Sequence, residues 1–158
     1  MAVVRYTWED NWNDVIRHVI FQDEELKRAM LIPKNKFDNI IAFRDQYFVN
    51  DAMSDVLVTD EAVRICYYQD PGFALNNHVK RRLLRFDIYV KREKQYDVDK
   101  VDRLKQRQKV IARRLRDLLT YGEHVQGLKF QYEDEYDLPV KTPGYVRFHI
   151  YFSYKITH

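Results

Sequence analysis

Cysteine, glycine and proline are scarce in this chain of 158 residues. Cys66 is the single cysteine, which excludes an internal disulfide and a zinc site built from several thiolates. The four glycines and four prolines are too few to build a flexible linker. No apolar run approaches the ~20 residues of a transmembrane helix, and residues 1–12 lack the apolar segment of a signal peptide. We therefore expect a globular protein of the cytosol, or of a particle assembled there, with no membrane partner.

Residue patterns typical of catalysis are missing as well. Ser54 and Ser153 are the only serines, and neither lies in a nucleophile-elbow sequence. The five histidines stand apart, and no two show the helical spacing of four that suits a metal ion. Cys66 falls in an aromatic, strand-like segment, where we expect a buried structural thiol and not a nucleophile. The sequence predicts no enzyme activity, no cofactor and no metal site.

Apolar and polar residues alternate in four segments, which is the pattern of half-buried β-strands. The predicted strands cover residues 62–68, 84–91, 128–132 and 146–156. Such alternation fits an antiparallel sheet with one covered face and one wet face. Two loops are predicted between strands, at residues 70–77 and 133–144, and the second is long enough to project from the sheet.

One long helix is predicted between the second and third strands, from about residue 97 to 121. Asp97 or Asp99 suits its start, and Gly122 suits its end. Its apolar residues recur at intervals of three, four or seven, and they are Val98, Val101, Leu104, Ile111, Leu115 and Leu118. A helix with one apolar side is expected to lie across the apolar face of the sheet.

The N-terminal third has helical periodicity. Asn13 or Asp14 suits the start of one helix, and Asp23 suits the start of a second, which must end before Pro33. Residues 38–48 fit either a third short helix or an extended segment, and periodicity does not decide between them.

These elements predict an α+β fold with two layers, in which one long helix at about 97–121 covers a mainly antiparallel sheet. A length of 158 residues suits a single domain over 1–158. We expect its N-terminal part, residues 1–50, to be helical, and residues 60–158 to form the sheet and the long helix.

The net charge is only +3, but basic residues cluster in the predicted long helix. Between Lys100 and Arg116 there are eight basic residues and one acidic residue, Asp102. Such a segment can be an ordinary solvated helix face, and it can also contact the phosphates of DNA, which requires cations but no motif. The residues that we predict to face DNA are Lys105, Lys109, Arg113 and Arg114.

An acidic, tyrosine-bearing segment lies in the predicted loop of residues 133–144. Its members are Glu133, Asp134, Glu135, Tyr136 and Asp137. One interpretation is a solvated loop, and the other is an interface with a neighbouring subunit. The 12 tyrosines of the chain suit surfaces that become buried on assembly, but strands favour tyrosine as well, so both interpretations stay open.

The order of these elements resembles a known protein family. A helical N-terminal part precedes strands that end in RLLRFDIYVKRE, followed by the amphipathic segment DKVDRLKQRQKVIARRLRDLL. Two late strands, GLKFQYEDEY and YVRFHIYFSYKI, complete the pattern. Over residues 60–158 this order is similar to that of small neck proteins of tailed bacteriophages, of the tail-terminator and head–tail joining type.

The resemblance implies a structural virion protein that assembles in the host cytoplasm into a ring of copies of itself, a hexamer or a dodecamer. It further implies contacts with neighbouring neck, tail-tube or portal proteins, and non-specific contact with DNA that passes through the channel of the ring. Such proteins have no catalytic residues. The alternative is a nucleic-acid-binding module that uses the basic helix 100–116.

Overall fold

The computed structural model describes the chain in seven parts. They are residues 20–39, 46–49, 61–74, 79–96, 105–121, 129–140 and 142–157. At residues 39, 71–74 and 156–157 only the backbone is described.

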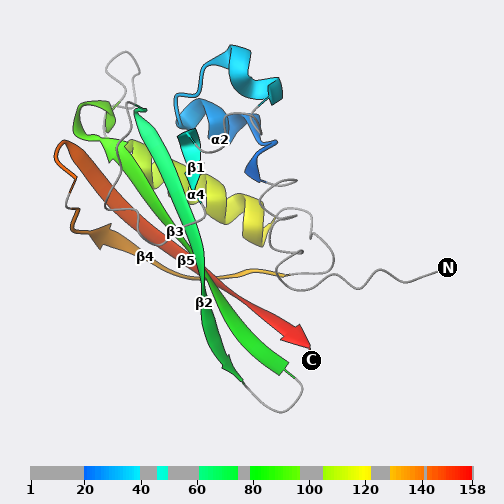
Figure 1. The fold of residues 1–158 in the computed structure, drawn as a ribbon. Coiled ribbons are helices and arrows are strands. Elements are labelled where there is room, and N and C mark those ends of the chain that lie inside the picture. The colour runs from blue at the N-terminus through cyan, green and yellow to red at the C-terminus, as the bar shows by residue number, and fades with distance from the viewer. Residues whose placement is uncertain are drawn as a thin grey trace.

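A five-stranded mixed sheet lies at the centre of the described structure (Figure 1). In order across the sheet the strands are β1 (Phe48–Val49), β2 (Val63–Ala74), β3 (Val79–Lys91), β5 (Tyr145–Thr157) and β4 (Gln131–Leu138). β1 is parallel to β2, whereas all other neighbouring pairs are antiparallel. The two central strands, β3 and β5, pair over their whole length.

Helices cover one face of this sheet (Figure 1). α4 (Arg107–Thr120) packs on β3, β5 and β4, and α2 (Glu24–Ala29) packs on α4. Two 3-10 helices, η2 (Lys34–Asn39) and η4 (Arg92–Lys94), complete the helical part. The side of α4 that faces the strands buries Ile111, Ala112, Leu115 and Leu119. Among the residues that the structure describes, no helix has the length and apolar character needed to cross a membrane.

The predicted α+β class, with its mainly antiparallel sheet, is confirmed. The apolar positions of the alternating segments whose side chains the structure describes turn to one face of the sheet, where they meet α4 and form the core. The strand residues of this core include Val63, Ile65, Leu84, Phe86, Ile88, Val90, Phe148, Ile150 and Phe152. Removal of this apolar surface from water is the main force that holds the helix layer on the sheet.

The long helix begins at Arg107, so the predicted start at Asp97 or Asp99 is wrong. Gln106 has an extended backbone, with φ −70° and ψ 131°, and the amide of Arg107 donates to the carbonyl of Gln95 at 2.6 Å. The turn that follows β3 therefore fixes where the helix begins. Residues 97–104 and Gly122 lie outside the described residues.

Arg107 itself is buried, although it belongs to the basic segment of the sequence. Its Nε donates to the carbonyl oxygen of Lys94 at 2.7 Å, and its Nη1 donates to the carbonyl oxygen of Ala29 at 3.0 Å. Since Ala29 is the last residue of α2, one guanidinium group links η4, α4 and α2.

α2 starts at the predicted cap. The side chain of Asp23 accepts a hydrogen bond from the amide of Leu26 at 2.8 Å. The end is closed by Leu31, whose φ of 59° is left-handed and whose amide donates to the carbonyl of Arg28. The amide of Ile32 donates to the carbonyl of Lys27, which completes a Schellman ending before Pro33.

The other N-terminal predictions are only partly within the described residues. A helix that starts at Asn13 or Asp14 lies outside them, apart from the buried Ile20. For the segment 38–48 the sequence did not decide between a helix and an extended conformation. The described residues at its two ends differ in secondary structure. Residues 38 and 39 belong to η2 and residues 46 and 47 are helical, whereas Phe48 begins β1.

The predicted loop at residues 70–77 is wrong over its first part, because β2 continues to Ala74. The register with β3 shifts between Asp70 and Phe73, across Pro71 and Gly72. Such a bulge accommodates a proline in an edge position of a sheet, and the strand can then resume its pairing.

The predicted projecting loop at 133–144 is also wrong, because β4 extends to Leu138. A register shift between Tyr132 and Asp134 sets Glu133 apart from the ladder and lets the pairing with β5 go on. The acidic segment is therefore an edge strand of the sheet.

The sheet face turned away from α4 is not the wet face that the alternation predicted. Cys66, Asp87 and Tyr89 on this face are fully buried, and His149 is 2% exposed. Cys66 and Tyr89 form a second apolar cluster with Tyr145, against which Val49 and Val140 pack. The prediction of a buried Cys66 is confirmed.

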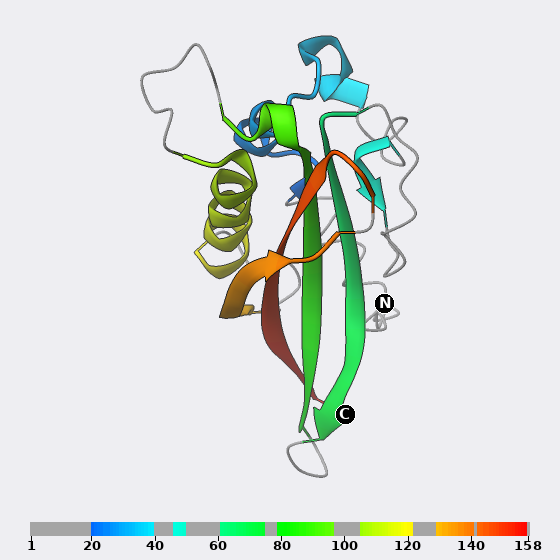
Figure 2. The same ribbon diagram turned by 90° about the vertical axis from the view of Figure 1, so that its left-hand side faces the viewer.

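β2, β3 and β5 extend beyond the helices as a three-stranded arm, which ends beside the C-terminus (Figures 1 and 2). A hydrogen bond of 2.7 Å from Gln69 to the hydroxyl of Tyr154 joins β2 to β5 across the arm. The short edge strand β4 ends at Leu138 and contacts α4, so it lies beside the helix layer.

Candidate functional site

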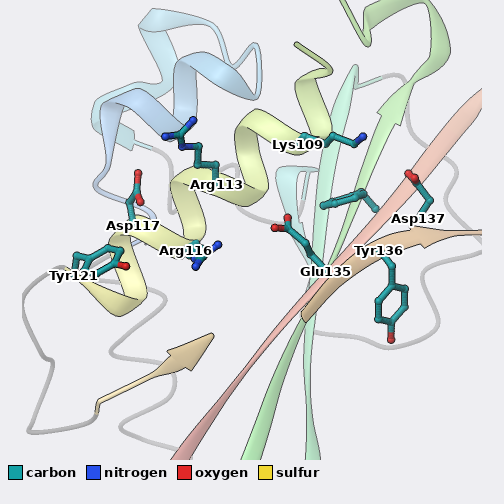
Figure 3. A pocket seen from close by; sticks show the side chains of 9 residues that line it. Lys109, Arg113, Arg116, Asp117, Tyr121, Glu135, Tyr136 and Asp137 are labelled. Carbon is teal, nitrogen blue, oxygen red and sulfur yellow. The ribbon is translucent and has the colours of Figure 1, made fainter. Parts of the chain in front are cut away.

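A groove of about 820 Å³ lies between α4 and the edge strand β4 (Figure 3). α4 contributes the cations Lys109, Arg113 and Arg116, and β4 contributes the carboxylates of Glu135 and Asp137. Asp117, Tyr121, Tyr136 and Phe148 complete the lining. Charges of both signs line this space, so we call it the bipolar groove.

The spacing of these residues explains why they meet. Lys109, Arg113 and Arg116 are four and three residues apart, which places them on one side of α4. Glu135 and Asp137 are two residues apart on a strand, so both side chains point to one face of the sheet. Figure 3 shows Glu135 pointing toward α4, whereas Tyr136 points away from it. On that opposite face the Tyr136 ring lies 5.2 Å from the His149 ring.

The structure separates the four residues that we predicted to face DNA. Lys109 and Arg113 are exposed and line the bipolar groove. Lys105 is exposed two residues before α4 begins. Arg114 lies on a different side of the helix and contacts α2. Contact of these residues with DNA stays a prediction.

Arg114 holds α4 to the start of α2. Its Nε and Nη2 donate to the two carboxylate oxygens of Asp23 at 2.8 and 2.7 Å, and its Nη1 lies 3.1 Å from Glu25. Burial alone would raise the pKa of Asp23, but the hydrogen bonds from Arg114 and from the amide of Leu26 lower it below its usual value. The guanidinium is thus already engaged within the chain.

The acidic segment divides into inward-directed and exposed carboxylates. Glu133 pairs with Arg81 and accepts a hydrogen bond from Ser153, and these contacts lower the pKa of its carboxyl although burial opposes them. Asp134 and Asp137 are exposed. Glu135 accepts a hydrogen bond of 3.0 Å from Tyr132. Participation of residues 133–137 in a subunit interface stays a prediction.

A second groove, of about 630 Å³, lies where the end of α4 meets the start of β4 and the end of β5. Arg116, Lys129 and Lys155 line it, and no carboxylate of the described residues does. We call it the cationic groove. The remaining lining residues are Thr120, Tyr121, Phe130, Gln131, Tyr132, Ser153 and Tyr154. The two grooves share Arg116 and Tyr121, so they adjoin each other along α4.

Sequence reasoning missed Arg116, Tyr121, Lys129 and Lys155 as site residues. Helical spacing could have found Arg116, because it continues the series of Lys109 and Arg113 on one side of the helix. Arg114 does not fit this series and therefore falls on a different side. No local pattern indicates that Lys129 and Lys155 lie near the end of α4. That proximity arises from the pairing of β4 with β5 and from the packing of α4 on both strands.

A buried polar cluster occupies the opposite face of the sheet and was also missed. Nδ1 of His149 donates to Asp87 at 2.7 Å, and Arg85 donates to Nε2 of the same ring at 3.1 Å. Arg147 donates to the second oxygen of Asp87 at 3.0 Å. These hydrogen bonds lower the pKa of Asp87 although burial opposes them, whereas burial and the charge of Asp87 raise the pKa of Tyr68 to about 12.

This cluster stabilises the sheet and does not offer a general base. Both imidazole nitrogens of His149 are used, which assigns the proton to Nδ1 and leaves Nε2 bonded to Arg85. A catalytic base needs a free lone pair within reach of a substrate proton. Elsewhere in the described parts of the chain, no three His, Cys, Asp or Glu residues come together in a group that could hold a metal ion.

Fold and grooves define an α+β protein that presents charged surfaces at the edge of a sheet. The chain belongs to the YomW family, whose model matches residues 23–154. This family is associated with phages, and the association agrees with the phage origin expected from the order of elements. The family match does not identify a neck protein. A comparison with curated proteins gives no match to the chain.

Proposed function

We propose that this protein is a structural subunit of a phage virion that assembles into a ring at the neck, as a tail terminator or head–tail joining protein. It would link tail to head around the DNA channel and contact neighbouring neck, tail-tube or portal proteins. The observation that carries this proposal is the charged edge strand β4, which lies beside the bipolar groove.

β4 is suited to a contact with another chain. It ends the strand order of the sheet, and β5 is its only partner among the described strands. An edge strand presents a row of backbone groups that a neighbouring segment can pair with. Asp134 and Asp137 are exposed along this strand. Their charge disfavours approach of acidic or apolar segments and favours a basic partner surface.

The bipolar groove supports association between identical copies. Cations of α4 and carboxylates of β4 lie on neighbouring surfaces, so a second copy can present a complementary charge to each. When the joined surfaces differ, the contact is head-to-tail, and such contacts close into a ring if the rotation between copies allows it.

The competing interpretation is a nucleic-acid-binding module on the basic segment 100–116. Two of its cations, Arg107 and Arg114, are engaged by the backbone of residues 29 and 94 and by Asp23. Lys109 and Arg113 line the same groove as the carboxylates of Glu135 and Asp137. A phosphate backbone would therefore meet mixed charge there, which favours the assembly proposal over this one.

The test is the mass of the assembled protein. Size-exclusion chromatography with light scattering, and electron microscopy, should show rings of the wild-type chain or of the chain bound to phage neck proteins. The double variant Glu135→Lys/Asp137→Lys reverses the acidic side of the bipolar groove, and we expect it to shift the assembly toward monomers.

The matched control is Asp38→Lys/Glu93→Lys, which makes the same change in net charge at exposed residues of η2 and η4. It should assemble as the wild type does. A wild-type chain that stays monomeric and is absent from purified virions contradicts the ring proposal. Unchanged assembly of the Glu135/Asp137 variant shows that the groove is not the contact.

A further inference from the structure

We propose that the cationic groove is a binding site for the phosphodiester backbone of nucleic acid, with Lys129 and Lys155 as the residues that contact phosphates. The inference goes beyond ring formation, because it assigns the surface that meets DNA. It also differs from the sequence prediction, which placed that surface on α4. It holds whether or not the chain forms a ring.

The charge of the groove is of one sign. Arg116 comes from α4, Lys129 precedes β4, and Lys155 lies near the end of β5, so three elements bring three cations to one space. Two carboxylates are bonded to lining residues of the groove without lining it themselves: Glu133 is held by Arg81 and Ser153, and Glu135 accepts a hydrogen bond from Tyr132. A polyanion that enters this groove meets cations without the carboxylates that line the bipolar groove.

The side chains are placed to bind from solution. Lys129 and Lys155 are exposed, and their flexible stems let the ammonium groups follow a phosphate chain. Arg116 is held in place, because its guanidinium carbon lies 3.9 Å from the centre of the Tyr132 ring. One cation is therefore fixed in position while two can adapt.

Tyr121 adds an aromatic surface at the rim of the groove. It is the C-cap residue of α4 and is 78% exposed, the largest exposure of any large hydrophobic residue that the structure describes. Proteins that bind single-stranded nucleic acids combine exposed aromatic rings with cations, since the bases stack on the rings while the phosphates pair with the cations. An acidic protein segment would also pair with the cations, but it has no bases to stack on the Tyr121 ring, so this ring would contribute less to its binding.

The experiment measures DNA binding by fluorescence anisotropy over a range of salt concentrations. Single-stranded and duplex oligonucleotides are separate arms. We compare the full-length wild type with three double variants, each of which lowers the net charge from +3 to +1: Lys129→Gln/Lys155→Gln in the groove, Lys105→Gln/Lys109→Gln on the basic segment, and Lys34→Gln/Lys94→Gln elsewhere.

We expect the groove variant to lose roughly tenfold or more in affinity and to lower the slope of log K against log salt by roughly two, because two phosphate contacts are lost. The other two variants should keep affinities close to that of the wild type. Tighter binding of the single strand than of the duplex would support the stacking role of Tyr121.

Three results would overturn the inference: no binding of either form of DNA at low salt, equal weakening by all three variants, or a loss confined to the Lys105/Lys109 variant. The last of these would support the α4 interpretation. Light scattering on the same samples reports assembly separately, so a failure of DNA binding and a failure of ring formation can be distinguished.

Discussion

Leu31 illustrates how backbone geometry can conflict with residue preference. A left-handed φ of 59° suits glycine, because a Cβ atom in this conformation approaches the carbonyl oxygen. The chain nevertheless places leucine there, where it closes α2 while 40% of the side chain is exposed. The strain of this position is therefore tolerated within the described structure.

We predict that Leu31→Gly is more stable than Leu31→Ala by about 1 kcal/mol. Both variants lose the leucine side chain, but only alanine keeps a Cβ in the left-handed region. The measurement is the free energy of unfolding in urea. The control is Arg28→Gly against Arg28→Ala inside α2, where the order should reverse, since glycine weakens a helix interior by about 0.5–1 kcal/mol. Equal stabilities at position 31 would refute the prediction.

At the scale of elements, the contact between α2 and α4 depends on few side chains. Asp23 caps α2 and pairs with Arg114 of α4, and Arg107 of α4 reaches the last carbonyl of α2. The Asp23 side chain is 12% exposed and that of Arg114 is 27% exposed. The pair is bidentate and largely protected from water, which strengthens the hydrogen bonds between the two groups.

A double-mutant cycle of Asp23→Asn and Arg114→Gln should give a coupling free energy of about 1–2 kcal/mol. Asparagine keeps the helix cap, so the cycle reports the ion pair. The reference cycle uses Glu24 and Arg28, a pair 3.3 Å apart whose side chains are both 66% exposed, and it should give about 0.5 kcal/mol at most. Similar coupling in both cycles would show that burial adds nothing to the first pair.

The sequence was informative about elements that depend on local patterns. Alternation located β2, β3 and β5 and the first two residues of β4, and Asp23 marked the start of α2. The start of α4 could not be predicted, because it depends on a hydrogen bond from Arg107 to Gln95 at the end of a preceding turn. The extent of β4 could not be predicted either, because charged residues disfavour strands unless a neighbour such as β5 pairs with them.

At the scale of the whole molecule, three carboxyl groups tie the stability of the fold to pH. The pKa values of Asp23, Asp87 and Glu133 are all lowered by hydrogen bonds and nearby cations, against the effect of burial. A carboxyl whose pKa is lower in the folded state stabilises the fold above its unfolded pKa. This stabilisation is lost as the pH falls through the folded pKa.

We therefore expect the free energy of unfolding to decrease as the pH drops below about 4. Asp87 is fully buried, so Asp87→Asn should lower stability at pH 7 by about 3 kcal/mol or more, because Arg147 keeps a buried charge without its partner. The same variant should show a shallower loss on acidification. Urea titrations from pH 7 to pH 3 test both points, and equally steep profiles for variant and wild type would contradict the assignment.

The candidate site was harder to predict than the fold. Charge runs identified Lys109, Arg113, Glu135 and Asp137, but as two separate surfaces. The structure brings them to one groove, because α4 crosses the strands beside β4. A sequence pattern of one element contains no information about which distant element will lie opposite it.

α4 lines both grooves, and besides its packing on the sheet it has anchors on its far side. Arg107 and Arg114 anchor it to residues 23–29, which line neither space. Residues 23–29 thus help to set the position of α4, and with it the width of two grooves that they do not line. Substitutions there should change binding at a distance, and loss of assembly alone will not locate the interface unless the position of α4 is checked as well.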